Sequence, residues 1–327
     1  ENNISYCIYD RTVANPTIWN VEEARELYLT EGAQAIIAFG GGSSMDCAKA
    51  AGARIVKPRQ SIQQMKGLLK VHKRLPLLIA IPTTAGTGSE TTLAALITDS
   101  EQHYKYPIND FSLIPRYAVL DYHETVGLPK MITATTGMDA LTHAIEGYTT
   151  KAAWEMTDMF HLKAIEIISR SLRSAVANEK EGREGMALGQ YIAGMGFSNV
   201  GLGIVHSMAH PLGAFYDTPH GVANALLLPY VMEYNAESPA APKYIHIAKA
   251  MGVNTDGMTE AEGVKAAIEA VKALSLSIGI PQKLHEINVK EEDIPALAVA
   301  AFNDVCTGGN PRPTSVAEIE VLYRKAF

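Results

Sequence analysis

Histidines are concentrated in one short stretch of this chain, HSMAHPLGAFYDTPH at residues 206–220. Three of the chain's 10 histidines lie there, among mostly apolar neighbours. His206 and His210 are four residues apart, so a helix would place both on one face, and His220 follows a Thr-Pro turn. Buried imidazole nitrogens lose their hydrogen bonds to water and need other partners. The stretch therefore predicts a site with its own chemistry.

A second stretch, GMDALTHAIEG at residues 137–147, adds a carboxylate to these histidines. Asp139 and His143 are again four residues apart, and taken alone they would be a hydrogen-bonded pair on a half-buried helix. Several imidazoles and a carboxylate in apolar surroundings are harder to satisfy without a metal. Such donors suit a divalent transition ion such as iron, zinc or manganese. The spacing leaves open which three or four side chains would bind it.

Two loops rich in small residues predict a second site, for a ligand that carries phosphate. AFGGGSSMDCAKA, at 38–50, follows an apolar strand and enters a helix, whose first amides would face the phosphate. It lacks the GxGxxG pattern, so alone it would be a tight turn. PTTAGTGSETT, at 82–92, follows another strand. Open α/β sheets bind nucleotides at the carboxyl ends of neighbouring strands, so the pair of loops favours a pyrophosphate-bearing cofactor.

These loops require a parallel sheet, and the first third of the chain has the pattern of one. Short apolar runs predict four strands, at 4–10, 33–40, 76–84 and 117–121. Two of them are apolar at nearly every position, which predicts strands covered by helices on both faces. Helical spacing over 21–33 completes a βαβ unit, and the polar segment 100–115 predicts a hairpin or a surface excursion.

The histidines require helices, and long amphipathic segments dominate the chain after residue 128. They are 133–149, 154–178, 181–206, 222–236, 240–251, 259–278, 292–302 and 314–327. A chain of 327 residues also exceeds the usual size of a single core. We therefore expect a nucleotide-binding α/β domain over 1–128 and an all-helical, metal-binding domain over 129–327.

Composition excludes several classes of protein. The net charge is −7, and no basic block offers a surface for nucleic acid or anionic membrane. Cys7, Cys47 and Cys306 form no CxxC pair, which fits a reducing cytoplasm. No apolar run is long enough to span a membrane. The chain opens on the polar Glu1-Asn2-Asn3, so we expect no signal peptide.

Four motifs, in their order along the chain, resemble those of the iron-dependent (group III) alcohol dehydrogenases. They are GGGSSMD, TTAGTGSE, GMDALTHAIEGY and GLGIVHSMAHPLGAFYDTPHGVANALLLP. The similarity covers essentially the whole chain, and motifs of this length are specific. The resemblance implies a dehydroquinate synthase-like fold, in which a Rossmann-like parallel sheet precedes an all-helical domain.

The same resemblance implies roles for individual residues. The metal ligands would be Asp139, His143, His206 and His220, binding Fe²⁺ or, as the second candidate, Zn²⁺. His210 would then be a catalytic residue that relays the proton of the alcohol. The contacts to NAD, or to NADP as the alternative, would come from Gly41, Gly42, Ser43, Asp46, Thr83, Thr84, Thr87 and Lys105. The pocket for the substrate and nicotinamide would be lined by Asn15, Phe197 and Cys306.

The chain departs from the family pattern in three ways. Ala94 stands where close members carry an asparagine near the substrate, and TTAGTGSE replaces their TTAGTAAE. The family's first strand, and the acidic residue after it that contacts the adenosine ribose, are missing. We therefore expect a longer functional protein, and in this chain a sheet face open to water. Without that acidic residue the choice between NAD and NADP stays open.

We predict a metal-dependent NAD(P) alcohol dehydrogenase, cytoplasmic and homodimeric, that transfers hydride directly between cofactor and substrate. Its substrate would be a small primary alcohol or diol such as 1,2-propanediol, ethanol, butanol or 1,3-propanediol, or the matching aldehyde. One alternative is a lyase resembling dehydroquinate synthase, although no basic cluster near the histidines would receive its polyanionic substrate. The other is a non-catalytic module that binds a metal or a nucleotide.

Overall fold

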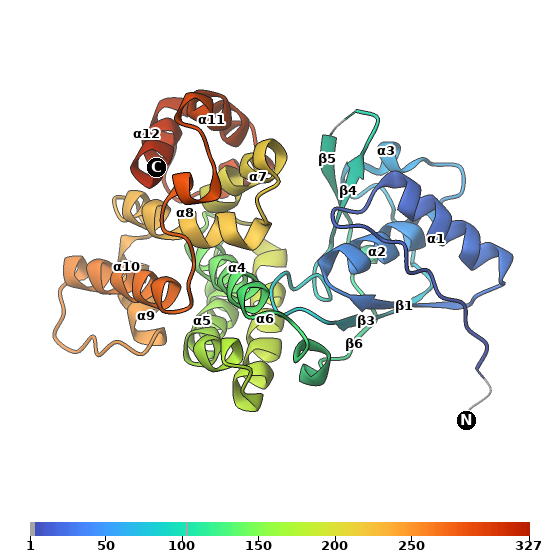
Figure 1. Ribbon diagram of the computed structural model, residues 1–327, viewed down its shortest axis with the longest axis horizontal. Helices are drawn as coiled ribbons and strands as arrows, with labels where there is room; N and C mark the ends of the chain where they lie inside the picture. Colours follow the sequence, from blue (N-terminus) through green and yellow to red (C-terminus); the bar gives the residue numbers. More distant parts are fainter. Residues whose placement is uncertain (1–3, 103) are drawn as a thin grey trace. The chain divides into compact units, whose positions relative to one another are not determined.

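The computed structural model describes residues 4–102 and 104–327, so the polar start Glu1-Asn2-Asn3 lies outside the described residues. The chain divides into two compact units (Figure 1). The N-terminal unit comprises residues 1–84 and 88–124, and the helical unit comprises residues 85–87 and 125–327. Thr87 of the second small-residue loop thus belongs to the helical unit, while Thr83 and Thr84 belong to the N-terminal unit.

The N-terminal unit is built on a parallel sheet with the order β1-β3-β6. Strand β1 (Ala35–Gly40) pairs with β3 (Leu77–Pro82) from Ala35 opposite Leu77 to Gly40 opposite Pro82. Both strands were predicted from their apolar runs and are confirmed. The predicted strand at 117–121 shortens to β6, Tyr117–Ala118. The parallel pairing brings the glycine loop after β1 and the threonine loop after β3 to the same end of the sheet.

The predicted strand at 4–10 is wrong. These residues have no partner in either sheet, and Ile4, Tyr6 and Ile8 are exposed. An alternating apolar pattern gives a strand only where a sheet edge accepts its backbone hydrogen bonds, and none does so here. Instead the Tyr9 hydroxyl donates to Glu23 at 2.9 Å, which holds the segment against α1 (Ile18–Thr30).

A second small sheet has the order β2-β5-β4. Strands β4 (Ala94–Asp99) and β5 (Tyr104–Asn109) are antiparallel, so the hairpin expected around 100–115 is confirmed. Strand β4 itself had not been predicted. The short strand β2 (Gly67–Leu68) pairs parallel to the end of β5.

Helix α2 (Gly42–Val56) covers one face of the main sheet and packs beside α1. The unit also contains α3 (Ile62–Met65) and the short 3-10 helices Phe111–Leu113 and Tyr122–Thr125. The prediction of helices on both sheet faces is wrong for the described residues, because Ile37 and Phe39 of β1 are exposed on the other face. The open apolar face expected from the sequence is thus present.

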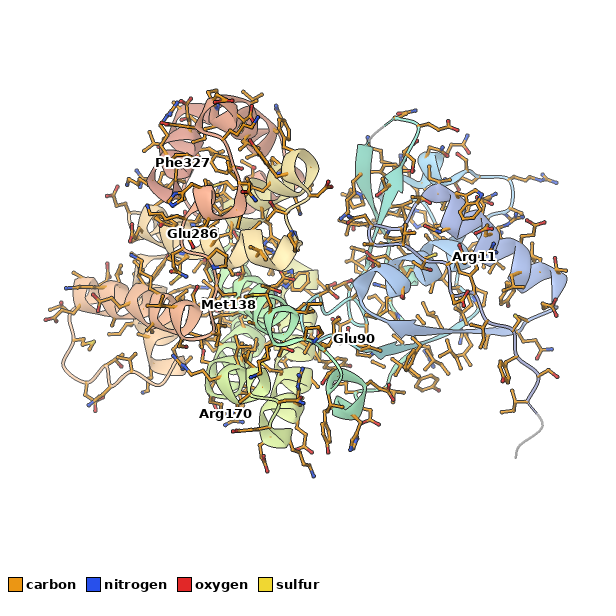
Figure 2. The ribbon with its side chains drawn as sticks, in the orientation of Figure 1. Arg11, Glu90, Met138, Arg170, Glu286 and Phe327 are labelled. Carbon is orange, nitrogen blue, oxygen red and sulfur yellow. The ribbon has the colours of Figure 1, made fainter. Side chains whose placement is uncertain are left out.

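The helical unit has no strand among its described residues and packs around α4 (Lys130–Thr149), which is buried along nearly its whole length. Helices α5 (Glu155–Val176), α6 (Lys180–Val200) and α8 (His220–Asn235) contact α4 directly. Met138 of α4 is fully buried, whereas Arg170 lies on the exposed side of α5 (Figure 2). The other helices are α7 (Ile204–Tyr216), α9 (Tyr244–Ala250), α10 (Glu260–Ser277), α11 (Ile294–Phe302) and α12 (Val316–Ala326).

Four 3-10 helices connect these elements, at Ala241–Lys243, Leu284–Ile287, Glu291–Asp293 and Val305–Gly309. The predicted helical segments are confirmed, with one break. The segment 181–206 divides into α6 and α7 because Gly201 follows α6 with φ +76, a conformation that favours glycine. In the described part of the chain, no helix is both long and apolar enough to cross a membrane.

Candidate active site

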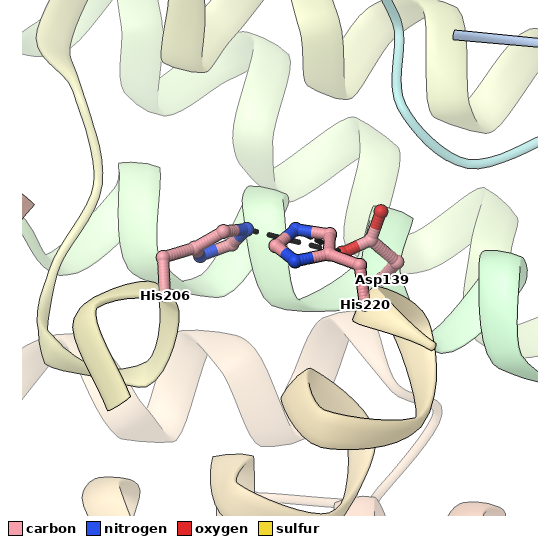
Figure 3. A group of neighbouring side chains, drawn as sticks. All are labelled: Asp139, His206 and His220. Atoms are coloured by element: carbon pink, nitrogen blue, oxygen red, sulfur yellow. Dashed lines mark ion pairs between the residues drawn. The ribbon is translucent and has the colours of Figure 1, made fainter. Parts of the chain in front are cut away.

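Three helices of the helical unit carry three of the four predicted metal donors to one point (Figure 3). Asp139 lies in the middle of α4, and His206 lies in the first turn of α7. Asp217 ends α7 in the left-handed conformation (φ 52), and after Pro219 the chain enters α8 with His220 as its first residue. The turn that the sequence suggested between the histidines is thus what brings His220 back toward His206.

The donor atoms of these residues converge. Asp139 Oδ1 lies 3.8 Å from His206 Nε2 and 3.6 Å from His220 Nε2, and one donor atom from each residue lies within 4.8 Å of the others. Asp139 and His206 are buried, 3% and 2% exposed, while the His220 side chain is 41% exposed. One carboxylate and two imidazoles form a donor set that divalent transition ions accept.

Asn224, four residues after His220 on α8, marks the point where the donors meet. Its amide Nδ2 donates to Asp139 Oδ1 at 2.6 Å and lies 3.1 Å from His206 Nε2 and 3.0 Å from His220 Nε2. Three acceptors therefore surround one positively polarised nitrogen, which has only two hydrogens to offer. Its Oδ1 is buried with no partner among the described residues. This arrangement fits a cation at the centre of the three donors.

Glu146 fixes the orientation of His206. Its Oε2 lies 2.6 Å from His206 Nδ1, and its Oε1 accepts the backbone N–H of Val205 at 2.7 Å. Burial opposes the charged imidazole, but the hydrogen bond and charge of Glu146, with the charge of Asp139, leave the pKa of His206 raised. A proton held on Nδ1 leaves the Nε2 lone pair facing Asp139, as a metal ligand requires. Sequence reasoning missed Glu146, although it lies seven residues after Asp139 on the same helix.

His143 lies beside the three converging donors but is not one of them. Its ring stacks between Phe197, with centroids 4.2 Å apart, and His206, with centroids 4.6 Å apart. Its Nδ1 lies 3.9 Å from Asp139 Oδ2 and is buried with no hydrogen-bond partner among the described residues. Burial lowers the pKa of His143 to about 4, so the ring is neutral and its orphaned nitrogen is free to act as a donor. Its role as a ligand stays a prediction.

His210 has a carboxylate partner that the sequence did not identify. Its Nδ1 lies 2.8 Å from Asp304 Oδ2, and its ring stacks on His220 with centroids 5.4 Å apart. Burial opposes the Asp304 charge, but hydrogen bonds from His210 and from the Cys306 backbone hold the pKa of Asp304 below its ordinary value. Burial and the charges of Asp304 and Glu146 raise the pKa of the Cys306 thiol well above its ordinary value. Cys306 is therefore a neutral thiol at neutral pH, and we assign it no role as a nucleophile in the reaction.

In the N-terminal unit, the structure brings together three of the predicted cofactor and substrate residues. The backbone N–H of Asn15 donates to Ser43 Oγ at 3.3 Å, and Lys105 Nζ donates to Asn15 Oδ1 at 2.8 Å. Gly41 is the residue before α2, and a Cβ there would lie 3.3 Å from Thr84 Cγ2. The glycine loop thus lies against the threonine loop, and Thr83 donates its N–H to Gly40 at 2.9 Å.

Two side chains of α2 bind the threonine loop through hydrogen bonds. They are Asp46 and Lys49, and sequence reasoning missed Lys49. Asp46 accepts the Ser89 hydroxyl at 2.8 Å and the Leu96 N–H at 3.1 Å. Lys49 is fully buried and donates to Ser89 Oγ at 3.0 Å and to the Thr92 carbonyl at 2.9 Å. Burial lowers the pKa of Lys49 to about 8. Lys49 lies three residues after Asp46, a spacing that places both side chains on the same face of a helix and could have identified Lys49 from the sequence.

Comparisons with known proteins cover both units. Residues 1–122 match the family model described as iron-containing alcohol dehydrogenase, and residues 133–327 match that of the C-terminal part of the Fe-containing alcohol dehydrogenase family. Lactaldehyde reductase of Escherichia coli K12 is 51% identical over 325 residues, covering 99% of this chain and 85% of that protein. NAD-dependent methanol dehydrogenase of Bacillus methanolicus is 40% identical over 329 residues, covering 100% and 86%. A solved 1,3-propanediol oxidoreductase superposes with a TM-score of 0.95 at 40% identity, covering 98% of this chain and 84% of that one.

Proposed function

Because this chain belongs to the iron-containing alcohol dehydrogenase family, we propose that it interconverts a small primary alcohol or diol and the matching aldehyde, using Fe²⁺ and NAD. Membership makes the chain an oxidoreductase and sets aside the dehydroquinate synthase-like lyase and the non-catalytic module. The motifs GMGFSNVGLG, at 194–203, and DVCTGGNPR, at 304–312, also favour a likeness to lactaldehyde reductase within the family. The observation that carries the proposal is the convergence of Asp139, His206 and His220 on one point.

In this proposal, Asp139, His206, His220 and the neighbouring His143 hold the metal, with Zn²⁺ as the second candidate. When both are bound, the ion supplies a Lewis acid that lowers the pKa of the alcohol, and NAD supplies the hydride acceptor. Glu146 keeps the Nδ1 proton of His206 in place, so that Nε2 stays available to the ion. Asn224 separates the donor atoms and keeps them directed inward until an ion replaces its amide.

His210 handles the proton of the alcohol. Asp304 accepts the Nδ1 proton of His210, which leaves the other ring nitrogen, Nε2, as the base. The His210 side chain is 31% exposed, so a proton taken up at Nε2 can pass on to water. The Cys306 thiol stays protonated, and within the helical unit Cys306 and Phe197 are proposed to line the substrate pocket.

The nucleotide contacts are proposed for Gly41, Gly42, Ser43, Thr83, Thr84, Thr87 and Lys105. The first amides of α2 offer donors to a phosphate, and the partly exposed glycines of the loop allow the backbone to approach it. Asp46 supports this site through Ser89 rather than as a free charge. NADP stays the alternative cofactor, and the assignment of residues 1–128 and 129–327 to nucleotide and metal binding stays part of the proposal.

Ala94 bears on which alcohol the enzyme prefers. A methyl side chain offers no hydrogen bond to a second hydroxyl group, so the site has little means to select a diol. We therefore expect simple two- to four-carbon alcohols, ethanol and butanol among them, to be used comparably with 1,2-propanediol, that is within about tenfold in kcat/KM. A stronger preference for the diol would contradict this substrate assignment and leave the dehydrogenase assignment intact.

We further propose that the enzyme is a cytoplasmic homodimer. All three cysteines are unpaired, which suits a reducing compartment. Light scattering of the purified protein would test the dimer, with a monomer mass as the contrary result.

The function is tested by purifying the protein without oxygen, removing metal with a chelator and adding back either Fe²⁺ or Zn²⁺ in an amount equal to the protein chains. Turnover is then followed over short alcohols, diols and aldehydes, with NADH and NADPH and their oxidised forms. Activity that disappears on chelation and returns with the ion is the expected result, with loss of activity in air if iron is native. Full activity of the metal-free protein would overturn the proposal.

A further inference from the structure

A second group of potential metal ligands lies beside the proposed proton relay. One donor atom each from His210, Asp304 and Cys306 lies within 4.8 Å of the others, and the three belong to α7 and the turn at 304–309. These residues are partly exposed, so an ion can reach them from solvent. They differ from the first donor set in one chemical respect, because only this group contains a sulfur.

We propose that His210, Asp304 and Cys306 bind a Zn²⁺ ion that inhibits the enzyme, separately from the ion at Asp139, His206 and His220. Zn²⁺ accepts nitrogen, oxygen and thiolate ligands together, and three protein ligands leave a fourth position for water. The carboxylate and the thiolate together also neutralise the two positive charges of the ion, while the imidazole stays neutral. Thiolate ligands favour zinc, whereas a site with only oxygen and nitrogen ligands, such as the one at Asp139, His206 and His220, discriminates less between zinc and other divalent ions.

The surroundings of Cys306 favour a cation. Burial opposes formation of a free thiolate, and so do the negative charges of Asp304 and Glu146, which both raise the pKa of the thiol. A divalent ion beside the sulfur reverses that effect and displaces the thiol proton. When zinc binds, the thiol proton is therefore released to solvent, and the ring proton of His210 leaves Nδ1 for Nε2 and stays on the ring. The bonds formed are those from zinc to Sγ, Nδ1 and the carboxylate oxygen, so one proton is released per site.

The existing geometry needs only a small adjustment. His210 Nδ1 and Asp304 Oδ2 are 2.8 Å apart in their hydrogen bond, whereas two ligands of a tetrahedral zinc ion are separated by about 3.3 Å. A side-chain rotation that moves either ligand atom by about half an ångström would give this separation. The ion then takes the place of the proton on Nδ1.

This substitution accounts for inhibition, and here the inference rests on the proposed role of His210. In the free enzyme the ring proton lies on Nδ1 and Nε2 is the base. With zinc on Nδ1, the ring proton moves to Nε2, which can then no longer accept the proton of the alcohol. Because the thiol must lose its proton, zinc affinity should depend on pH. While the pH is below the thiol pKa, each rise of one pH unit should tighten zinc binding about tenfold.

The binding test uses iron-loaded enzyme without oxygen, titrated with Zn²⁺ and separately with Co²⁺ as a spectroscopic probe. We expect one further metal per chain, retention of the iron, and a thiolate-to-cobalt charge-transfer band. Cys306→Ser should lose both the band and the second equivalent, while Cys7→Ser, which removes an exposed thiol, should keep both. Absence of the band in the wild-type protein, or loss of iron equal to the zinc bound, would overturn the proposal.

A second measurement does not depend on any variant. Zn²⁺ should slow alkylation of Cys306 by iodoacetamide, read by peptide mass spectrometry, and leave the exposed Cys7 unaffected. Equal alkylation of Cys306 with and without zinc would contradict the site. If the second ion binds with its thiolate band but the iron-loaded enzyme oxidises no alcohol, the proposed function fails and the zinc site stands. If activity is present and zinc fills the site without inhibiting, the inhibitory role is wrong.

Discussion

At the scale of single residues, the candidate site is a set of paired side chains rather than a row of independent ligands. Glu146 holds His206, Asn224 holds Asp139, and Asp304 holds His210, each across two different elements. Such partners fix which ring nitrogen carries the proton and which faces the site. Substituting these partners therefore tests the orientation of the histidines, which substituting the ligands themselves would not.

Replacing Glu146 by glutamine tests the first pair. The amide keeps the size of the side chain but lacks the charge that holds the Nδ1 proton of His206, so Nε2 is no longer fixed as the donor. We expect metal affinity to fall about 10–100-fold while the fold is kept. Metal content after dialysis against graded chelator gives the affinity. Glu166→Gln, an exposed carboxylate on α5, is the matched control. Unchanged affinity in Glu146→Gln would show that Glu146 only packs the core.

Replacing His210 by alanine tests the relay. Because His210 is outside the converging donors, the variant should retain iron, and its rate of alcohol oxidation should fall about 10²–10⁴-fold. Iron content and kcat measured on the same preparation separate the two effects. A variant that is isolated without metal would mean that His210 is a ligand and that the roles are assigned wrongly.

At the scale of elements, His161 of α5 packs against α4 and α6, two of the helices that carry residues of the site. Its ring is fully buried, and neither nitrogen has a hydrogen-bond partner among the described residues. A Cβ at Gly147 of α4 or at Gly196 of α6 would lie 2.3 or 2.4 Å from Nε2, so only glycine fits at either position. Gly147 follows Glu146 and Gly196 precedes Phe197, so the ring sets the spacing of two helices that shape the site.

The burial of His161 predicts how stability depends on pH. Burial lowers the pKa of His161 from 6.5 to about 3, so between these values the unfolded chain binds a proton that the folded chain does not. Stability is then lost as pH falls from 6.5 toward 3, by at most about 1.4 kcal/mol per pH unit for this residue. The unfolding temperature of His161→Leu, or of His161→Gln should leucine not fit, should fall less between pH 7 and pH 4.5 than that of the wild type.

The control for this prediction is His123→Gln, which removes an exposed histidine. It should follow the wild-type profile. Identical slopes for His161 variants and wild type would mean that the buried ring is already protonated in the folded protein.

At the scale of the whole molecule, the sequence predicted the helices from their hydrophobic periodicity, but it did not predict which distant segments pair with one another. The amphipathic period alone located the helices of the helical unit, because each buries a face against its neighbours. The segment ISYCIYD has as strong a strand pattern as AIIAFG, yet only AIIAFG has an edge to pair with. Strand formation depends on a second segment, which local composition does not reveal.

The same distinction explains what was found of the site. The spacing of Asp139 and of the histidines at 206–220 predicted donors on shared faces, and three of them converge. Asp304 lies 94 residues from His210 in sequence, so no local pattern could join the two. Glu146 lies within the motif GMDALTHAIEG, but its partner His206 lies on another helix, α7. The pairing therefore depends on how the two helices pack, which the motif does not show.

The central claim is that this chain moves a hydride directly from an alcohol carbon to NAD at a metal-dependent site. The most direct measurement uses 1,2-propanediol with deuterium on C1, iron-loaded protein and NAD, and follows the label by mass spectrometry of the cofactor. We expect deuterium to appear in the reduced nicotinamide, with none lost to solvent, and we expect chelation to abolish the transfer. Deuterium released to water, or labelled cofactor formed equally well by metal-free protein, would contradict it.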